Sequence, residues 1–221
     1  MKRALVIGAS GGIGSAMCAE FARRGYEVVG VSRSVDGLDV TDEVSVAGVL
    51  GRLEAPFEVV FNATGALEVD GAAPEKSLRQ LDAKAMADQF AVNCIGPALV
   101  LKHAVRLLPK EGRSVLAVLS ARVGSIGDNR LGGWHSYRAA KAAVNQIVRG
   151  TAIELGRTHK DHICVALHPG TVATEFTRKY LGRHPAVSAE DAAVRLVDVL
   201  EGLTVEQSGG FYDYAMKEIP W

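Results

Sequence analysis

The stretch ALVIGASGGIG at residues 4–14 carries most of the information about the fold. Its first four residues are apolar, which is typical of a short strand buried on both faces. The glycines at 8, 12 and 14 let the chain turn tightly and approach a ligand closely. A helix with apolar spacing then begins near Ile13, and its N-terminus offers free N–H groups and a partial positive charge. This unit predicts a site for the pyrophosphate of a dinucleotide; a turn with only a structural role is the alternative.

Four further short runs are apolar on both alternating faces, which also predicts buried strands. They span 28–31, 57–61, 115–119 and 163–167. Segments with helical spacing separate the strands. These segments lie at 13–24, 136–155 and 189–200, and another begins near Thr41. A longer one covers 77–108 and should bend near Gly96-Pro97. Strands that alternate with helices predict a single α/β domain over residues 1–221, built as a doubly wound (Rossmann-type) parallel sheet with helices on both faces.

The bulk composition is that of an ordinary soluble protein. Hydrophobic residues make up 48% and charged residues 23%, and the formal net charge is zero. This balance disfavours nucleic acid or an anionic membrane as the main partner. The cysteines at 18, 94 and 164 lack metal-ligand spacing, and His159 and His162 lack a third ligand, so we expect free thiols and no metal site. Without a signal peptide or an apolar run of ~20 residues, we expect a cytoplasmic protein.

Four polar residues follow the glycine-rich turn in an order that indicates catalysis. Tyr137 and Lys141 are four positions apart in the clearest predicted helix, so their side chains share one face. Ser120 follows the strand at 115–119 and therefore lies at the carboxyl edge of the sheet, where ligands bind. Asn93 lies in the long helical stretch near its bend. An exposed helix pair is the alternative for Tyr137 and Lys141 taken alone.

The glycine spacing and these four residues resemble the short-chain dehydrogenase/reductase family over essentially the whole chain. The resemblance implies that Tyr137 is the general acid or base, that Lys141 tunes it and holds the nicotinamide ribose, and that Ser120 hydrogen-bonds the substrate oxygen. By the same resemblance, Asn93 orders a water that connects Lys141 to solvent. A neighbouring ammonium and the oxidised nicotinamide ring should lower the pKa of the Tyr137 phenol from its usual ~10.

The residues after the second strand bear on the choice of cofactor. Ser32-Arg33-Ser34 stands there, and the first carboxylate is Asp36. A guanidinium and two hydroxyls suit a 2′-phosphate, so NADP(H) is favoured over NAD(H); a solvated surface arginine is the alternative. The resemblance also covers a loop after the third strand, where Ala63-Thr64 replaces the family's Asn-Ala, and a Pro-Gly turn after the fifth. The cofactor-binding residues that it implies are Gly8, Ser10, Gly11, Gly12, Ile13, Gly14, Ser32, Arg33, Ser34, Asp39, Val40, Asn62, Ala63, Thr64, Gly65, Tyr137, Lys141, Pro169, Gly170, Val172 and Thr174.

The segments around the expected substrate site are less regular. The extra length at 127–134 and the endings at 211–214 and 219–221 resemble the compact C-factor and sniffer-type carbonyl reductase branch of the family. The segment 175–187 should form a lid, which Arg178, Lys179, Arg183 and His184 make basic. An acidic substrate or a solvated loop would each explain that charge. Trp134 and His135 are candidates for the mouth of the pocket.

Taken together, these patterns predict an NADP(H)-dependent oxidoreductase that moves a hydride between nicotinamide and a carbonyl or alcohol carbon. The alternative is a signalling or sensor protein of the same fold that binds cofactor with little turnover, which would not need the tyrosine acid. An epimerase or dehydratase is disfavoured, because its relatives need a larger substrate region. The resemblance implies a homodimer or homotetramer, with a small molecule as the other partner.

Overall fold

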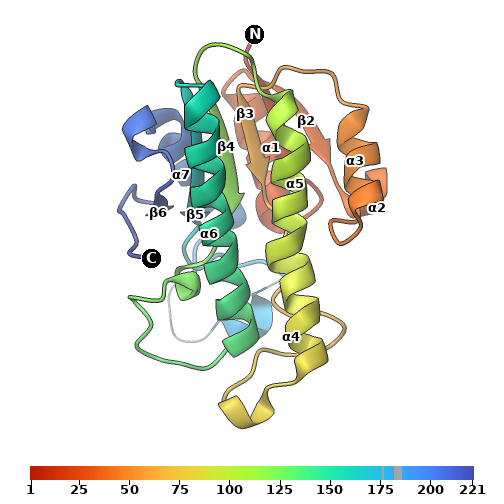
Figure 1. The fold of residues 1–221 in the computed structure, drawn as a ribbon, viewed down its shortest axis with the longest axis vertical. Helices are drawn as coiled ribbons and strands as arrows, with labels where there is room; N and C mark the ends of the chain where they lie inside the picture. Colours follow the sequence, from red (N-terminus) through yellow and green to blue (C-terminus); the bar gives the residue numbers. More distant parts are fainter. Residues whose placement is uncertain (176, 182–185) are drawn as a thin grey trace.

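The computed structural model describes residues 1–175, 177–181 and 186–221. Within them, six parallel strands form one sheet in the order β2-β1-β3-β4-β5-β6 (Figure 1). The strands are β1 (Arg3–Ile7), β2 (Glu27–Val31), β3 (Val59–Asn62), β4 (Ser114–Leu119), β5 (His162–His168) and β6 (Phe211–Asp213). The doubly wound fold and its five expected strands are confirmed. The sequence analysis missed β6, which has only three residues and gains its strand character by pairing with β5 at the edge of the sheet.

Helices cover both faces of the sheet. One face carries α1 (Gly12–Arg23) and α7 (Ala189–Gly202), which pack against each other. The other carries α3 (Glu43–Gly51), α5 (Gly96–Ala104) and α6 (His135–Thr158), and Figure 1 shows α5 and α6 side by side in front of the strands. The short helix α2 (Arg33–Asp36) follows β2, and α4 (Ala83–Phe90) leads into α5.

The two layers of core explain why the strands are apolar without interruption. Leu5 and Ile7 of β1 belong to the core shared with α3, α5 and α6. Ala4 and Val6 of the same strand belong to the core shared with α1 and α7. Successive side chains of a strand point to opposite faces, so a sheet covered on both sides needs apolar residues at every position.

The long helical stretch bends where the sequence analysis expected it. A π-helical turn at Ala91–Ile95 joins α4 to α5, immediately before Gly96-Pro97. Gly96 suits this place, because an added Cβ would stand 2.9 Å from Cγ2 of Val40. The stretch starts later than predicted, since the Asp82 carboxylate caps α4 by accepting the Ala85 N–H at 2.9 Å. By length and composition Ala83–Leu107 could cross a membrane, but here its apolar side chains Val100 and Leu101 lie in the core.

Candidate active site

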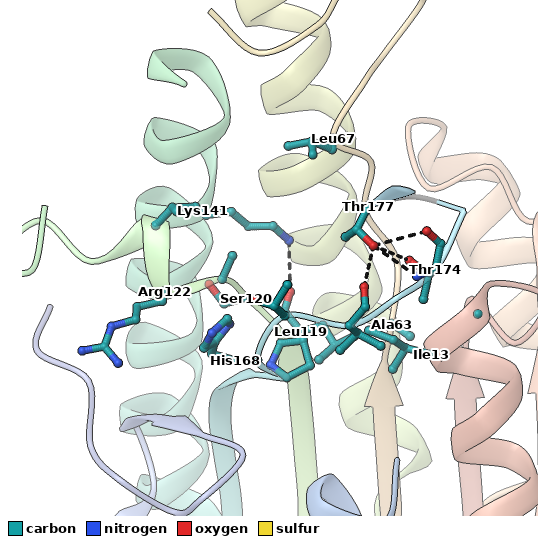
Figure 2. A pocket seen from close by; sticks show the side chains of 18 of the residues that line it. Ile13, Ala63, Leu67, Leu119, Ser120, Arg122, Lys141, His168, Thr174 and Thr177 are labelled. Atoms are coloured by element: carbon teal, nitrogen blue, oxygen red, sulfur yellow. Dashed lines mark hydrogen bonds between the residues drawn. The ribbon is translucent and has the colours of Figure 1, made fainter. Parts of the chain in front are cut away.

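A cavity of about 450 Å³ lies at the carboxyl edge of the sheet (Figure 2). Loops that follow β1, β3, β4 and β5 line it together with α6, so segments far apart in the sequence converge there. This edge is where open α/β sheets bind their ligands, beside the point where the strand order reverses. Of the expected site residues it is lined by Gly11, Gly12, Ile13, Gly14, Ala63, Thr64, Gly65, Ser120, Tyr137, Lys141, Pro169, Gly170, Val172 and Thr174.

The glycine-rich turn leaves no room for side chains. Gly8 has a φ of +91°, a conformation that favours glycine. A Cβ on Gly14 would lie 2.1 Å from the carbonyl oxygen of Gly8, and one on Gly12 would lie 2.8 Å from Cγ2 of Thr174. At the start of α1, the N-cap Gly11 offers no side-chain cap and the first turn holds no acidic residue. The first N–H groups of the helix therefore face the cavity without a competing acceptor, which fits a pyrophosphate.

The residues expected at the adenosine end lie beyond the cavity, after β2. Ser32 caps α2 by accepting the Val35 N–H at 3.3 Å, and the Asp36 carboxylate accepts the Ser32 N–H at 2.7 Å. The Arg33 guanidinium is exposed and has no hydrogen bond or ion pair with any described residue. Asp39 is occupied locally, since its carboxylate accepts both the N–H and the hydroxyl of Thr41. An exposed arginine beside a backbone-bound carboxylate suits a ligand phosphate.

Tyr137 and Lys141 lie on one buried face of α6. The Lys141 amine donates to the carbonyl oxygen of Leu119 at 3.1 Å and stands 5.8 Å from the centre of the Tyr137 ring. Burial lowers the pKa of the Lys141 amine to about 8 and raises the pKa of the Tyr137 phenol well above its usual value. Without cofactor, desolvation therefore raises the pKa of the phenol, which is the opposite direction to the shift expected from the lysine and the oxidised nicotinamide ring together.

Ser120 and Asn93 are both buried, in different surroundings. The Ser120 hydroxyl donates to Oδ1 of Asn145 at 2.6 Å, a contact that the sequence analysis missed. Nδ2 of Asn93 donates to the carbonyl of Ala66 and to Oε1 of Gln89, each at 2.7 Å. Asn93 does not line the cavity, but an added Cβ on Gly65 would stand 2.9 Å from its Oδ1 and 3.4 Å from Nζ of Lys141. Asn93 therefore borders the lysine across the Gly65 backbone.

Aromatic side chains form the outer wall of the cavity. Trp134 meets the Tyr137 ring edge-on at 6.2 Å and the Tyr180 ring at 5.6 Å between centres. The Trp134 backbone is left-handed, with a φ of +51°, and its N–H donates to the carbonyl of Glu75 at 2.5 Å. The buried Glu75 carboxylate accepts the Ser136 N–H at 3.2 Å and also its hydroxyl. Glu75 thus caps the start of α6 and holds Trp134 in place; nothing in the local sequence around Glu75 indicates this.

The described part of the expected basic lid is neutralised. Arg178 pairs with Glu175 at 3.0 Å and Lys179 pairs with Glu68 at 2.8 Å, while Arg183 and His184 lie outside the described residues. The Tyr180 hydroxyl also donates to Glu68, at 2.6 Å. Arg178 and Lys179 therefore each have a carboxylate partner within the protein.

Several lining residues were missed because they belong to no motif in the chain, namely Leu67, Leu119, Ala121, Arg122 and Val123. Thr171 of the Pro-Gly turn also lines the cavity, as do Thr177, Tyr180 and Leu181 of the segment expected to cover the substrate site. Arg122 also lines the wall, but Figure 2 shows its guanidinium turned away from Lys141, and it bonds Asp128 at 2.5 Å. His168 was noted only as part of the Pro-Gly motif; it is desolvated, which lowers the pKa of its ring to about 4, so it is neutral at pH 7. The Thr177 hydroxyl donates to the Val172 carbonyl at 2.5 Å and accepts the Thr174 N–H, fixing the loop after β5.

Known proteins resemble this chain over most of its length. A family model described as Enoyl-(Acyl carrier protein) reductase matches residues 8–199. A 1-hydroxy-2-glutathionyl-2-methyl-3-butene dehydrogenase from Rhodococcus sp. (strain AD45) is 34% identical over 227 residues, covering 96% of each chain. C-signal from Myxococcus xanthus is 33% identical over 145 residues, covering 66% of this chain and 84% of its own. The structure of a short-chain dehydrogenase/reductase from Burkholderia multivorans with bound NADP is 27% identical, with a TM-score of 0.84 and coverage of 100% and 99%.

These relatives agree with the expected family and with its compact C-factor branch. The family match extends over the glycine turn, strands β2 to β5 and α6, and the structural match extends over the whole fold. The chain therefore belongs to the short-chain dehydrogenase/reductase family and is an oxidoreductase.

Proposed function

We propose that the protein reduces the carbonyl group of a substrate with an apolar body, uses NADPH, and catalyses the reverse oxidation of the alcohol. The observation that carries the proposal is the convergence of Ser120, Tyr137 and Lys141 on the cavity that also holds the glycine turn. A protein that only senses a dinucleotide would have no use for a buried phenol and amine at the place where a substrate would sit.

The bound cofactor would supply the hydride that attacks the carbonyl carbon. The chain's own groups handle the oxygen: Ser120 hydrogen-bonds it, and the Tyr137 hydroxyl gives it a proton. Burial keeps the Tyr137 pKa high, so the phenol carries its proton at pH 7, as a proton donor must. The resulting phenolate is stabilised by the Lys141 ammonium, whose pKa of about 8 leaves most of it charged at pH 7.

The cofactor preference rests on Arg33. Its guanidinium has no partner among the described residues, whereas the neighbouring Asp36 carboxylate is bound to the Ser32 N–H. A 2′-phosphate would give the guanidinium a charge-assisted partner, which the hydroxyl of NADH would not. The bound NADP named for the Burkholderia structure is in line with this preference.

The substrate class follows from the wall of the cavity. Leu67, Val123, Trp134, Tyr180 and Leu181 line it, and the described basic side chains Arg178 and Lys179 are paired with carboxylates. An apolar or aromatic ketone or aldehyde suits this wall. The Rhodococcus relative is named for a glutathionyl alcohol, so such a conjugate belongs in the substrate panel as a second candidate.

The test is an assay of the full chain with aromatic ketones, aliphatic ketones, aldehydes and a glutathione-conjugated alcohol. Turnover is measured by the absorbance of NADPH, which carbonyl reduction consumes and alcohol oxidation forms. We expect turnover of apolar carbonyls, and we expect Tyr137→Phe to reduce kcat by about 10²- to 10⁴-fold. NADPH affinity should stay within about twofold, because the hydroxyl adds little to cofactor binding. Tight NADPH binding without turnover of any panel member would favour the sensor protein instead, and normal turnover by Tyr137→Phe would refute the mechanism.

We also propose that the protein is cytoplasmic and that it forms a homodimer or homotetramer. The cysteines at 18, 94 and 164 are free thiols, in line with a reducing compartment. Ile147 and Ile153 of α6 are 37% and 49% exposed, so this helix presents apolar side chains that a second copy could cover. Light scattering on the purified protein measures the assembly directly.

A further inference from the structure

The hydroxyl of Ser120 already has a partner before any substrate is considered. Its Oγ lies 2.6 Å from Oδ1 of Asn145, and both side chains are buried, with exposed fractions of 5% and 2%. A serine hydroxyl has one proton to donate. While that proton is given to Asn145, Ser120 can only accept a hydrogen bond, whereas carbonyl reduction needs a donor to the substrate oxygen.

The other end of the Asn145 amide is unsatisfied. Its Nδ2 is buried and has no hydrogen-bond partner among the described residues. Leaving such a buried donor unpaired is costly, because it loses its hydrogen bond to water and gains none in the protein. The nitrogen and oxygen of an asparagine amide have the same shape, so a half-turn exchanges them without moving any neighbour. In the turned amide, Nδ2 donates to Ser120 Oγ and the serine proton is released toward the cavity.

Asn145 acts from behind Ser120 and does not reach the substrate cavity. It lines a separate cavity of about 580 Å³ between α6 and the C-terminal segment. It lies one helical turn beyond Lys141 and two beyond Tyr137, on the same buried face of α6. The Ser120 backbone is held by its N–H, which donates to the Leu167 carbonyl at 2.8 Å. The direction of the serine proton is therefore the main freedom left, and Asn145 is the group that decides it.

We infer that Asn145 is a positioning residue: its amide N–H donates to Ser120 Oγ and thereby turns the serine proton toward the substrate oxygen. The inference rests on the proposed carbonyl reduction. Tyr137 supplies the proton and Lys141 stabilises the phenolate that remains. Asn145 makes Ser120 a hydrogen-bond donor to the substrate oxygen while negative charge develops there.

The test uses two variants of Asn145 in two backgrounds. Asn145→Asp replaces the amide by a carboxylate that can only accept, so it holds the serine proton away from the substrate. Asn145→Leu has a similar size and makes no hydrogen bond. We expect kcat to fall about 100-fold for Asn145→Asp and about 10-fold for Asn145→Leu, as for loss of one donor to the developing oxyanion, with KM nearly unchanged. Gln146→Asp is the matched control, because it adds the same charge to an exposed position of α6 and should retain wild-type kcat.

The same variants in a Ser120→Ala background separate positioning from a structural role. If Asn145 acts through the serine, neither substitution lowers kcat further once the hydroxyl is gone. An equal loss in both backgrounds, or wild-type kcat in Asn145→Asp, would overturn the inference while leaving carbonyl reduction intact. Folding of Asn145→Asp is judged by circular dichroism and NADPH binding. If this variant does not fold, Asn145→Leu in the wild-type and Ser120→Ala backgrounds provides the test: its loss of kcat should again disappear in the Ser120→Ala background. Absence of turnover in the wild type would instead overturn the proposed function, and this inference with it.

Discussion

The two ends of the cavity differ in whether backbone or side-chain atoms form the surface that would contact a ligand. The end proposed to hold the cofactor phosphates is backbone: the glycines of the turn leave space, and the first N–H groups of α1 have no side-chain cap. The substrate end is made of side chains. A distant part of the chain holds Trp134 through the backbone carbonyl of Glu75 and holds Tyr180 through the carboxylate of Glu68. Backbone sites tolerate no added atom, whereas side-chain sites tolerate substitution and change what they recognise. Substitutions at the two ends should therefore fail in different ways.

The largest effect is expected at Gly14. In Gly14→Ala the new Cβ would stand 2.1 Å from the carbonyl oxygen of Gly8, so the turn must move. Losing one or two charge-assisted hydrogen bonds to the phosphates should weaken NADPH binding by about 100-fold or more, measured by fluorescence titration. Gly150→Ala is the control, because nothing lies within 4 Å of its added Cβ. Unchanged NADPH affinity in Gly14→Ala would show that the ligand binds elsewhere.

Arg33→Ala should produce the next largest change, also at the cofactor end. The lost pair with a 2′-phosphate is expected to raise the Kd of NADPH by about 10- to 100-fold, since hydrogen bonds to charged groups contribute about 1.5–3 kcal/mol. NADH binding should change little, because NADH carries no such phosphate. Titration of both cofactors against wild type and variant checks this. Equal weakening of both would remove the case for NADP(H).

At the substrate end, Trp134→Ala should change recognition and leave the cofactor alone. The indole forms part of the wall, and its loss should raise KM for an aromatic ketone by about 10-fold while NADPH affinity stays constant. Leu131→Ala is a control in the same segment, since Leu131 is 91% exposed. The comparison between the two ends would fail if Trp134→Ala weakened NADPH as much as it weakened substrate.

The smallest expected effect is on stability, through Glu75. Hydrogen bonds from Ser136 lower the pKa of the Glu75 carboxyl, although burial opposes them. A carboxyl whose folded pKa is lowered stabilises the fold above its unfolded pKa, and this contribution disappears as the pH falls through the folded value. Glu75→Gln should therefore reduce the free energy of unfolding at pH 7 by about 1–2 kcal/mol.

The pH dependence of this difference is the sharper test. Urea unfolding of wild type and Glu75→Gln should show the gap at pH 7 and its closure at pH values below the ordinary glutamate pKa of 4.5. A gap that persists in acid would mean that the glutamate contributes through packing and not through its charge.

Most of the proposed catalytic residues could be selected from the sequence because their signals are local. Tyr137 and Lys141 share a helix face at spacing four, and the glycine turn directly follows β1. Asn145 continues the same spacing by one more turn, so a search for polar residues along the buried face of α6 would have found it. Glu75 gave no such signal, because its partner Ser136 is 61 positions away.

The sequence by itself determined the doubly wound sheet, the glycine-rich turn after β1 and the order of the polar residues. The patterns that indicate the sheet and the turn involve only residues that are close together in the sequence. Only the tertiary structure decided the burial of Tyr137, the partner of the Ser120 hydroxyl and the aromatic wall, because these features depend on contacts between distant segments. Burial raises the pKa of the Tyr137 phenol, which its spacing from the lysine along the helix does not reveal.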